Sequence, residues 1–444
     1  MHTASSLFTL LALASRTLAR VQYVGVAIPG IDFGCDIDGS CPIGDNVEFP
    51  LKQYGGGDGA AQMKHFVKND EMNVFRLPTS WQWIVNNELG DLDETNWGKY
   101  DDLVQACLDT GAYCMIDLHN FARYDGGIIG QGGPSDDVFV DLWKQITHKY
   151  ADEDRIIFGL MNEPHDVDIK IWAATCQKAV TAIRKAGATS QMILLPGTNF
   201  ASAETFVSTG SAEALAAISN PDGSKDGLIL DVHKYLDINN SGTYTECTTD
   251  NVKAFEELAS WLRKNKRKCM ISESGASLDE SCIEKFCAQN KAISDNSDVY
   301  IGFVAWGAGS FESDYILNLS PSGSPGDYTD NKLMKECVIK PFIEDGGPLT
   351  TSSSTKTKTK TIATKTKTAD ADETTTATMA QNSAKSTDRV FKEEDPSSES
   401  ASATETGASK ASSTADKDNA GYARSVQTLT GGLMLGAALF FLGA

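Results

Sequence analysis

The sequence is poor in positive charge, and its cysteine and histidine residues form no pattern typical of a metal centre. Its 39 lysine and arginine residues are outnumbered by 60 aspartate and glutamate residues, for a formal net charge of -21. Because phosphate backbones are bound by clustered basic side chains, this balance argues against a nucleic-acid partner. No CxxC pair is joined by a second CxxC or a histidine pair. We therefore expect no structural zinc site, no other metal and no cofactor.

Long apolar runs are also missing. Leu7–Ala14 and Gly431–Ala444 are both shorter than the roughly 20 residues of a membrane-spanning helix. The first precedes the small residues Thr17-Leu18-Ala19 and predicts a secretory signal over residues 1–19, with a frayed N-terminal helix as the alternative. The second follows small residues from Asn419 and a polar spacer, which is typical of a GPI-attachment signal over residues 419–444. We expect Asn419 or a small neighbour to receive the anchor, and membrane contact only through this lipid; a tail-anchored helix is the alternative.

Large apolar residues are scarce between residues 346 and 418, where serine, threonine, lysine and alanine predominate. Such a segment cannot bury enough apolar surface to offset its conformational entropy. It is predicted to be a disordered, O-glycosylated stalk. One catalytic domain is left over residues 20–345.

Within that domain, short apolar runs alternate with amphipathic stretches. Two of these stretches, Trp97–Thr110 and Asp168–Ala186, end at Gly111 and Gly187, as helices commonly do. Runs that are apolar throughout are typical of strands buried on both faces. Eight alternations predict an α/β fold, a (β/α)8 TIM barrel. The strand candidates are Val21–Pro29, Val74–Pro78, Tyr113–His119, Ile156–Asn162, Met192–Gly197, Leu228–Tyr235, Cys269–Ser274 and Tyr300–Gly307.

Polar residues gather where these runs stop, which is where such barrels carry their active sites. Glu163 and Glu273 end the fourth and seventh runs, and they are the only glutamates at predicted strand ends. A carboxylate pair suits glycoside hydrolysis, because one group protonates the departing sugar oxygen and the other attacks the anomeric carbon. A salt bridge at the barrel mouth is the alternative for either residue.

The neighbouring polar residues suit the same chemistry. Arg76 and Tyr235 can hold one glutamate ionised by charge-assisted contacts. Asn162 can bond a sugar hydroxyl whose contact strengthens in the transition state. His119 and His233 can orient sugar hydroxyls or tune the acid, unless they are structural histidines.

Three tryptophans are candidates for stacking on sugar rings. Trp306 ends the eighth run and can place its indole face under a pyranose. Trp81 and Trp83 follow the second run, and for these two ordinary loop packing is an equal alternative.

These motifs closely resemble glycoside hydrolase family 5, over almost all of Val21–Val338. The resemblance is carried by Val74–Pro78, Asp117–Asn120, Gly159–Pro164, Asp231–Tyr235, Ile271–Gly275 and Val304–Gly307. Gly126–Pro134, Leu160–Val167 and Ser297–Phe311 are similar to the fungal endoglucanases of that family. The resemblance to this family implies that Glu163 is the acid/base and Glu273 the nucleophile. It also implies that the attacked sugar is held by Arg76, His119, Asn162, His233, Tyr235 and Trp306.

Ten cysteines in an exported chain favour disulfides. The resemblance implies the pairs Cys35–Cys41, Cys107–Cys114, Cys247–Cys282 and Cys287–Cys337. Cys176 and Cys269 depart from that pattern, so whether they pair is open. The sequons at Asn239 and Asn318 are candidate N-glycosylation sites.

The sequence thus predicts a secreted, surface-anchored, monomeric endo-β-1,4-glucanase that acts on a β-glucan with retention of configuration. No cysteine- and aromatic-rich cellulose-binding module flanks the domain, which favours soluble or wall-embedded glucan. A β-mannanase or β-1,3-glucanase on the same barrel is the nearest alternative. A non-catalytic wall carbohydrate-binding protein is the alternative from another class.

Overall fold

Eight parallel strands close into a barrel in the computed structural model, which describes residues 20–44 and 47–346. Neighbouring strands follow chain order, and the last pairs with the first, Tyr23 lying opposite Gly302. The eight predicted strands and the barrel fold are confirmed, with ends that differ by a few residues. The strands are β1 (Tyr23–Ala27), β2 (Val74–Thr79), β3 (Tyr113–Leu118), β6 (Ile156–Gly159), β7 (Met192–Pro196), β8 (Leu228–His233), β9 (Cys269–Ser274) and β10 (Tyr300–Ala305).

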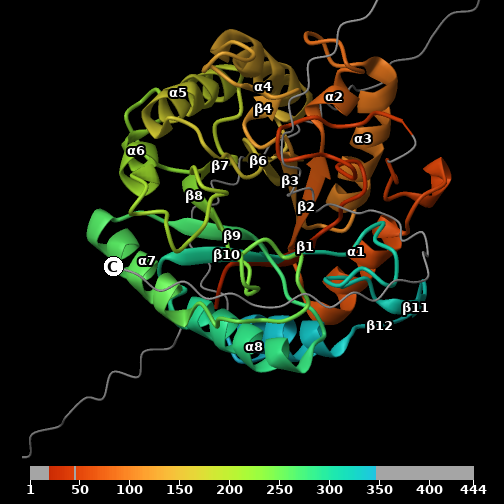
Figure 1. The fold of residues 1–444 in the computed structure, drawn as a ribbon. Coiled ribbons are helices and arrows are strands. Elements are labelled where there is room, and N and C mark those ends of the chain that lie inside the picture. The colour runs from red at the N-terminus through yellow and green to blue at the C-terminus, as the bar shows by residue number, and fades with distance from the viewer. Residues whose placement is uncertain (1–19, 45–46, 347–444) are drawn as a thin grey trace, which may run out of the picture. The chain divides into compact units, whose positions relative to one another are not determined.

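Helices surround the barrel on its outside (Figure 1). They are α1 (Gly59–Asp70), α2 (Trp81–Ile84), α3 (Glu94–Leu108), α4 (Asp136–Tyr150), α5 (Ile169–Lys185), α6 (Ser211–Ala217), α7 (Val252–Asn265) and α8 (Glu280–Asp295). A last helix, η2 (Met334–Glu344), packs along α8. Short elements occupy the connections: η1 (Lys52–Tyr54) and the hairpins β4 (Arg123–Tyr124)–β5 (Gly127–Ile128) and β11 (Ser322–Ser324)–β12 (Asp327–Thr329).

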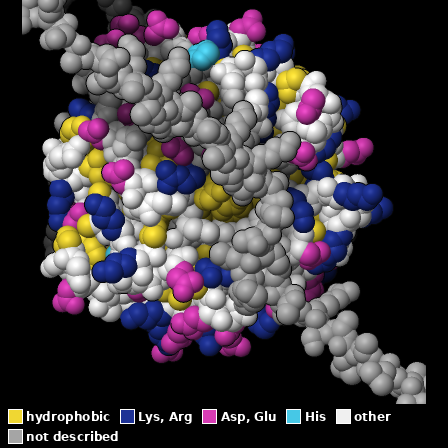
Figure 2. Space-filling model, turned by 180° about the vertical axis from the view of Figure 1, so that it is seen from behind, with side chains coloured by type: hydrophobic (Ala, Val, Ile, Leu, Met, Phe, Trp, Pro, Cys, Tyr) yellow, Lys and Arg dark blue, Asp and Glu magenta, His cyan; other side chains and the backbone are white. Residues whose placement is uncertain are grey.

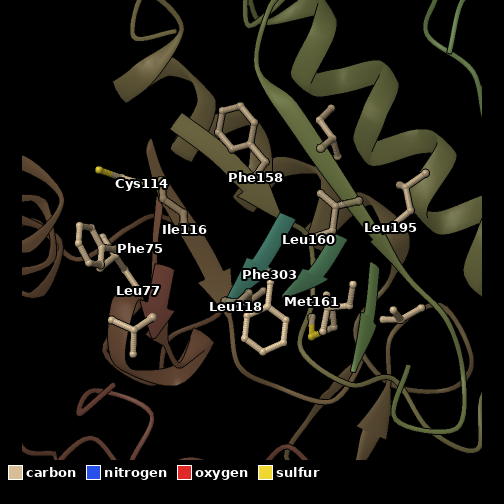
Figure 3. Packing of buried hydrophobic residues seen from close by; sticks show 14 of the residues in the cluster. Phe75, Leu77, Cys114, Ile116, Leu118, Phe158, Leu160, Met161, Leu195 and Phe303 are labelled. Atoms are coloured by element: carbon tan, nitrogen blue, oxygen red, sulfur yellow. The ribbon is translucent and has the colours of Figure 1, made fainter. Parts of the chain in front are cut away.

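Each strand alternates between the barrel interior and the layer under the helices, because successive side chains point to opposite faces. On β2, Val74 faces the interior, whereas Phe75 and Leu77 belong to the outer core shown in Figure 3. Arg76 shares the interior face with Val74. One apolar residue from every strand fills the interior: Ala27, Val74, Met115, Ile157, Leu194, Ile229, Met270 and Ile301.

The helix ends follow the local sequence. Asp93 accepts a hydrogen bond from the backbone N–H of Asn96 at 2.8 Å, so α3 begins at Glu94, earlier than predicted. Asp168 caps α5 in the same way. Gly111 and Gly187 have φ values of 88° and 111°, and each follows a helix end as expected.

Four disulfides join the cysteine pairs that the family resemblance implied. Cys176 and Cys269 are free thiols in the buried core, which answers the question that the sequence left open. No helix among the described residues is long and apolar enough to cross a membrane. On the face shown in Figure 2, basic and acidic side chains are intermingled over the described surface. The predicted signal, stalk and anchor segments, with Asn419, lie outside the described residues.

Candidate active site

The eight predicted site residues meet at one end of the barrel. They lie on or shortly after β2, β3, β6, β8, β9 and β10, and each is at most 8% exposed. In chain order they are Arg76, His119, Asn162, Glu163, His233, Tyr235, Glu273 and Trp306. This end is the carboxyl end of the parallel strands, where the loops of such barrels hold substrates.

Glu163 and Glu273 lie side by side, with His233 between them. One carboxylate oxygen of each glutamate and a ring nitrogen of His233 are all within 4.8 Å of one another. The Nδ1 atom of His233 is 2.8 Å from Oε1 of Glu163 and 3.9 Å from Oε1 of Glu273. A pair that inverts configuration stands about 6.5–9.5 Å apart to admit a water, whereas a retaining pair stands about 5–5.5 Å apart. With one oxygen of each within 4.8 Å, Glu163 and Glu273 are closer than an inverting pair, which agrees with retention.

Glu273 is held as a carboxylate. Burial alone would raise its pKa, but Arg76, His233 and His119 lower it, and the net pKa lies below the ordinary value. Arg76 forms an ion pair with Oε2. The hydroxyl of Tyr235 donates a hydrogen bond to Oε1 at 2.7 Å. Both oxygens are thus oriented, and the group is kept ionised.

Arg76 organises the floor of the site. Its Nη2 lies 2.7 Å from Oδ1 of Asn162 and 2.9 Å from Oδ2 of Asp117. Because Oδ1 of Asn162 accepts from Arg76, the Asn162 amide donates to Nε2 of His119, 3.2 Å away. His119 then carries its proton on Nδ1, which lies 2.9 Å from Asp117. Both nitrogens of His119 therefore have partners inside the protein, and His119 helps to position Asn162.

Asp117 is a site residue that the sequence reasoning missed. Burial raises its pKa, but Arg76 and His119 lower it more, so it remains ionised beneath both. Its signal was available: Asp117 lies on β3 two residues before His119, which directly follows the strand, and side chains two apart along an extended segment share a face.

Glu163 follows β6 in a strained backbone conformation. Its φ of 40° lies in the left-handed region, which a non-glycine residue adopts at a cost and which is enriched at functional sites. The backbone N–H of Asn162 donates to the carbonyl of Leu118 at 2.8 Å and anchors this turn to β3. In this conformation the side chain of Glu163 reaches His233, 2.8 Å from its Nδ1.

A second missed group lies behind His233. The Nε2 atom of His233 is 2.9 Å from Oγ of Ser272, which also bonds Asp231. Burial raises the pKa of Asp231 to about 6, although His233, Ser272 and Arg76 act against this rise. Burial lowers the pKa of His233, but Glu273 and Glu163 raise it above the ordinary value. His233 thus connects the glutamate pair to a buried acid.

The tryptophan predictions have different outcomes. Trp306 joins the site: its ring stacks on His119 at 5.7 Å and 19°, and Nε1 donates to the hydroxyl of Tyr315 at 3.0 Å. Trp81 is fully buried in α2 against Tyr124 and Phe139, so its candidacy as a sugar platform is wrong. Trp83 lines a cavity of about 480 Å³ outside the glutamate pair.

Among the described residues, two buried groups of side chains have the composition of a cation site. One is Glu163, His233 and Glu273 themselves, where Arg76 already supplies a positive charge. The other, His65, Asp70 and Asp330, involves α1 and the segment after β12.

Comparison with known proteins agrees with this geometry. Residues 42–309 match the family Cellulase (glycosyl hydrolase family 5). Endoglucanase EG-II of Hypocrea jecorina is 53% identical over 330 residues, 73% of this chain and 79% of that protein. The manganese dependent endoglucanase Eg5A of Phanerodontia chrysosporium is 39% identical over 307 residues, 68% of this chain and 76% of that protein. The crystal structure of Cel5A (EG2) from Hypocrea jecorina superposes with a TM-score of 0.71 at 53% identity, over 72% of this chain and 99% of that one.

Proposed function

The chain belongs to glycosyl hydrolase family 5, and on that premise we propose that it is an endo-β-1,4-glucanase whose acid/base is Glu163 and whose nucleophile is Glu273. The observation that carries the assignment is that two adjacent carboxylates have different hydrogen-bond partners and different solvent exposure. Arg76 and Tyr235 hold both oxygens of Glu273 in the charged form. Among the described residues, His233 is the one hydrogen-bond partner of the Glu163 side chain. That side chain is also more exposed to solvent, 11% against 1% for Glu273.

In the first half of the reaction, a Glu273 oxygen attacks the anomeric carbon while Glu163 gives its proton to the departing glucan oxygen. The carbon–oxygen bond to the leaving chain breaks, and a glycosyl ester forms on Glu273. Positive charge develops on the sugar ring during this step, and the carboxylate beside it stabilises that charge.

In the second half, Glu163 takes a proton from water, and the resulting hydroxide attacks the same carbon. Glu273 departs as a carboxylate, which its contacts with Arg76 and Tyr235 favour. His233 lies 2.8 Å from Glu163 and can stabilise its anionic form by donating from Nδ1. Two displacements at one carbon return the original configuration.

Binding of the attacked sugar is assigned to the surrounding polar and aromatic side chains. Asn162, held by Arg76 and His119, is placed beside Glu163 to contact a sugar hydroxyl. Trp306, directly after β10, supplies an aromatic surface for the sugar ring. Unbranched β-1,4-glucan is the proposed substrate; mannan and β-1,3-glucan are the alternatives that the assay must include.

Reducing-sugar release from carboxymethyl cellulose, mannan and laminarin tests both substrate and residues. The purified chain is compared with Glu163→Gln and Glu273→Gln, which keep the shape but lose the ionisable group. We expect cellulose to be preferred and both variants to lose roughly 10³-fold or more of activity. Binding of glucan without any release of reducing ends would instead support the carbohydrate-binding alternative.

Azide distinguishes the two glutamates, using an aryl cellobioside whose leaving group needs no acid. With Glu163→Ala the glycosyl ester still forms, and azide should trap it as the β-glycosyl azide. With Glu273→Gly, azide should replace the nucleophile and give the α-glycosyl azide. Exchange of the two products would reverse the assigned roles.

Export and surface attachment are further parts of the proposal. Four disulfides support passage through an oxidising compartment, as residues 1–19 predict. We propose display through the 346–418 stalk and a lipid on Asn419. Release of cell-bound activity by a phosphatidylinositol-specific phospholipase would support it, and activity found only in the medium would contradict it.

Asn239 is the better proposed acceptor for an N-glycan. It is exposed, whereas the Nδ2 atom of Asn318 donates to the carbonyl of Glu312 at 2.9 Å. Glycopeptide mass spectrometry should therefore find sugar at Asn239. Gel filtration should find a monomer.

A further inference from the structure

A buried cluster distinct from the glutamate pair lies between α1 and the segment that follows β12. His65 and Asp70 come from α1, and Asp330 comes one residue after β12. One ligand atom of each lies within 4.8 Å of the others, and all three residues are buried. The glycoside chemistry uses none of them.

One buried carboxylate oxygen of Asp70 has no hydrogen-bond partner in the part of the chain that the structure describes. Its side chain is 8% exposed, and Oδ2 is shielded from solvent without a donor among the described residues. This oxygen points at the cluster, 3.7 Å from Nε2 of His65. A buried carboxylate oxygen without a donor is costly, so such a group calls for a partner that is missing from the polypeptide.

The spacing fits a shared ion. Nε2 of His65 is 2.9 Å from Oδ1 of Asp330 and 3.7 Å from Oδ2 of Asp70. Ligand atoms that share one zinc or manganese ion at about 2.1 Å stand about 3.0–3.5 Å apart. Small side-chain movements would bring the three atoms around one centre.

The charge of the cluster also favours a cation. Two carboxylates face one imidazole, and no lysine or arginine nitrogen of the described residues lies within 4 Å of either carboxylate. Lys335 acts on Asp70 only across space and is itself exposed. A divalent ion would neutralise both carboxylates at once.

Asn69 completes the arrangement around His65. Its side-chain amide is 2.9 Å from Nδ1 of His65. An ion on Nε2 requires the histidine proton to sit on Nδ1, and the Asn69 amide can turn to offer its oxygen to that proton. Metal-bound histidines commonly donate their second nitrogen in this way.

From these contacts we propose that His65, Asp70 and Asp330 bind one divalent transition-metal ion, such as Mn²⁺ or Zn²⁺. The imidazole nitrogen favours transition-metal ions, Zn²⁺ more than Mn²⁺, over Mg²⁺ and Ca²⁺, which prefer oxygen alone. The ion ties α1 to the end of the β11–β12 excursion. Gln62 of α1 in turn holds both backbone groups of Gly309 at 2.7 and 3.0 Å, so the ion stabilises the loop that follows Trp306.

Calorimetric titration of the chelator-treated, full-length chain with Mn²⁺, Zn²⁺, Mg²⁺ and Ca²⁺ tests the proposal. We expect one Mn²⁺ or Zn²⁺ per chain, bound at least tenfold more tightly than Mg²⁺ or Ca²⁺. Asp70→Asn should weaken binding at least tenfold. Glu71→Gln is the matched control, since it removes one adjacent but exposed carboxylate and should leave binding unchanged.

Thermal unfolding supplies a second readout. Saturating metal should raise the Tm of the wild-type chain by a few degrees. Metal-free Asp70→Asn should be at least as stable as metal-free wild type, because it removes an unpartnered buried charge, and it should show no rise with metal. Absence of binding by wild type, or binding that survives Asp70→Asn, would overturn the proposal. So would binding abolished by Glu163→Gln, which would place the ion at the catalytic pair.

Discussion

The hydroxyl of Tyr235 lies 2.7 Å from Oε1 of Glu273 and donates a hydrogen bond to it inside a site where both residues are at most 3% exposed. The other oxygen of Glu273 is paired with Arg76. The carboxylate is therefore held on both sides, by a neutral donor and by a cation. These two contacts are expected to contribute differently to catalysis.

Tyr235→Phe removes the neutral donor and leaves the ring. A hydrogen bond to a charged group contributes about 1.5–3 kcal/mol, so kcat/KM should fall about 10- to 100-fold. Because the Tyr235 hydroxyl helps to lower the pKa of Glu273, the acid limb of the kcat/KM profile should move to higher pH. Tyr124→Phe is the control, since the buried Tyr124 hydroxyl has no hydrogen-bond partner among the described residues. An unshifted acid limb in Tyr235→Phe would contradict this role.

Arg76→Lys keeps the charge but loses the planar group that contacts Glu273, Asn162 and Asp117 together. A lysine ammonium cannot reproduce this fork, so we expect kcat to fall at least about 10²-fold. Arg184→Lys is the matched control: Arg184 is also buried but bonds Asn220 and Ala188 away from the site. It should lose stability while kcat is retained. Equal losses of kcat in both variants would show that Arg76 acts only through the fold.

Asp231 makes the stability of the enzyme depend on pH. Burial raises its pKa in the folded state to about 6 from 3.8, so below about pH 4 it is protonated whether the chain is folded or not. Between these values the folded state keeps a proton that the unfolded state loses, and stability falls as pH rises. Above about pH 6 Asp231 is ionised in both states, and its burial then lowers the free energy of unfolding by its full amount, on the order of 3 kcal/mol.

Asp231→Asn replaces the ionisable group with a neutral group of the same shape. The free energy of unfolding should rise by up to about 3 kcal/mol at pH 8, with no gain at pH 4. Urea unfolding at the two pH values measures the difference. A gain that is the same at both would mean that ionisation of Asp231 is not its cause.

The sequence predicted the barrel and the meeting of Glu163 and Glu273 because both depend on local patterns. Strands buried on both faces are apolar throughout, and the ends of such runs meet at one end of a barrel, as with Glu163 and Glu273. The contacts of Asp117, Asp231 and Ser272 depend on which strands adjoin and in what register, and one sequence does not carry that information.

Two other features show the same limit. Trp81 follows β2 as a sugar-binding residue might, but α2 turns its ring into the core against Phe139. His65 and Asp330 are 265 residues apart, and only the closed barrel brings them within 2.9 Å. Long-range packing decides both cases.

The disulfide between Cys287 and Cys337 is expected to stabilise the fold more than the one between Cys107 and Cys114. The first spans 50 residues and joins α8 to η2, whereas the second spans 7. Cross-linking lowers the entropy of the unfolded chain more for a longer loop, by about 4 kcal/mol here against about 2.5 kcal/mol. Paired alanine substitutions, compared by guanidinium unfolding, should show that order.

Both disulfides lie away from Glu163 and Glu273, so kcat at 25 °C should be unchanged in whichever variants remain folded. The disulfide variants should thus lose stability while keeping kcat, whereas the Arg76 and Tyr235 variants should lose activity. If both alanine pairs cost the same free energy of unfolding, the unfolded-chain entropy is not what distinguishes them. Strain or packing in the folded state around α8 and η2 would then dominate, because those contributions do not scale with loop length.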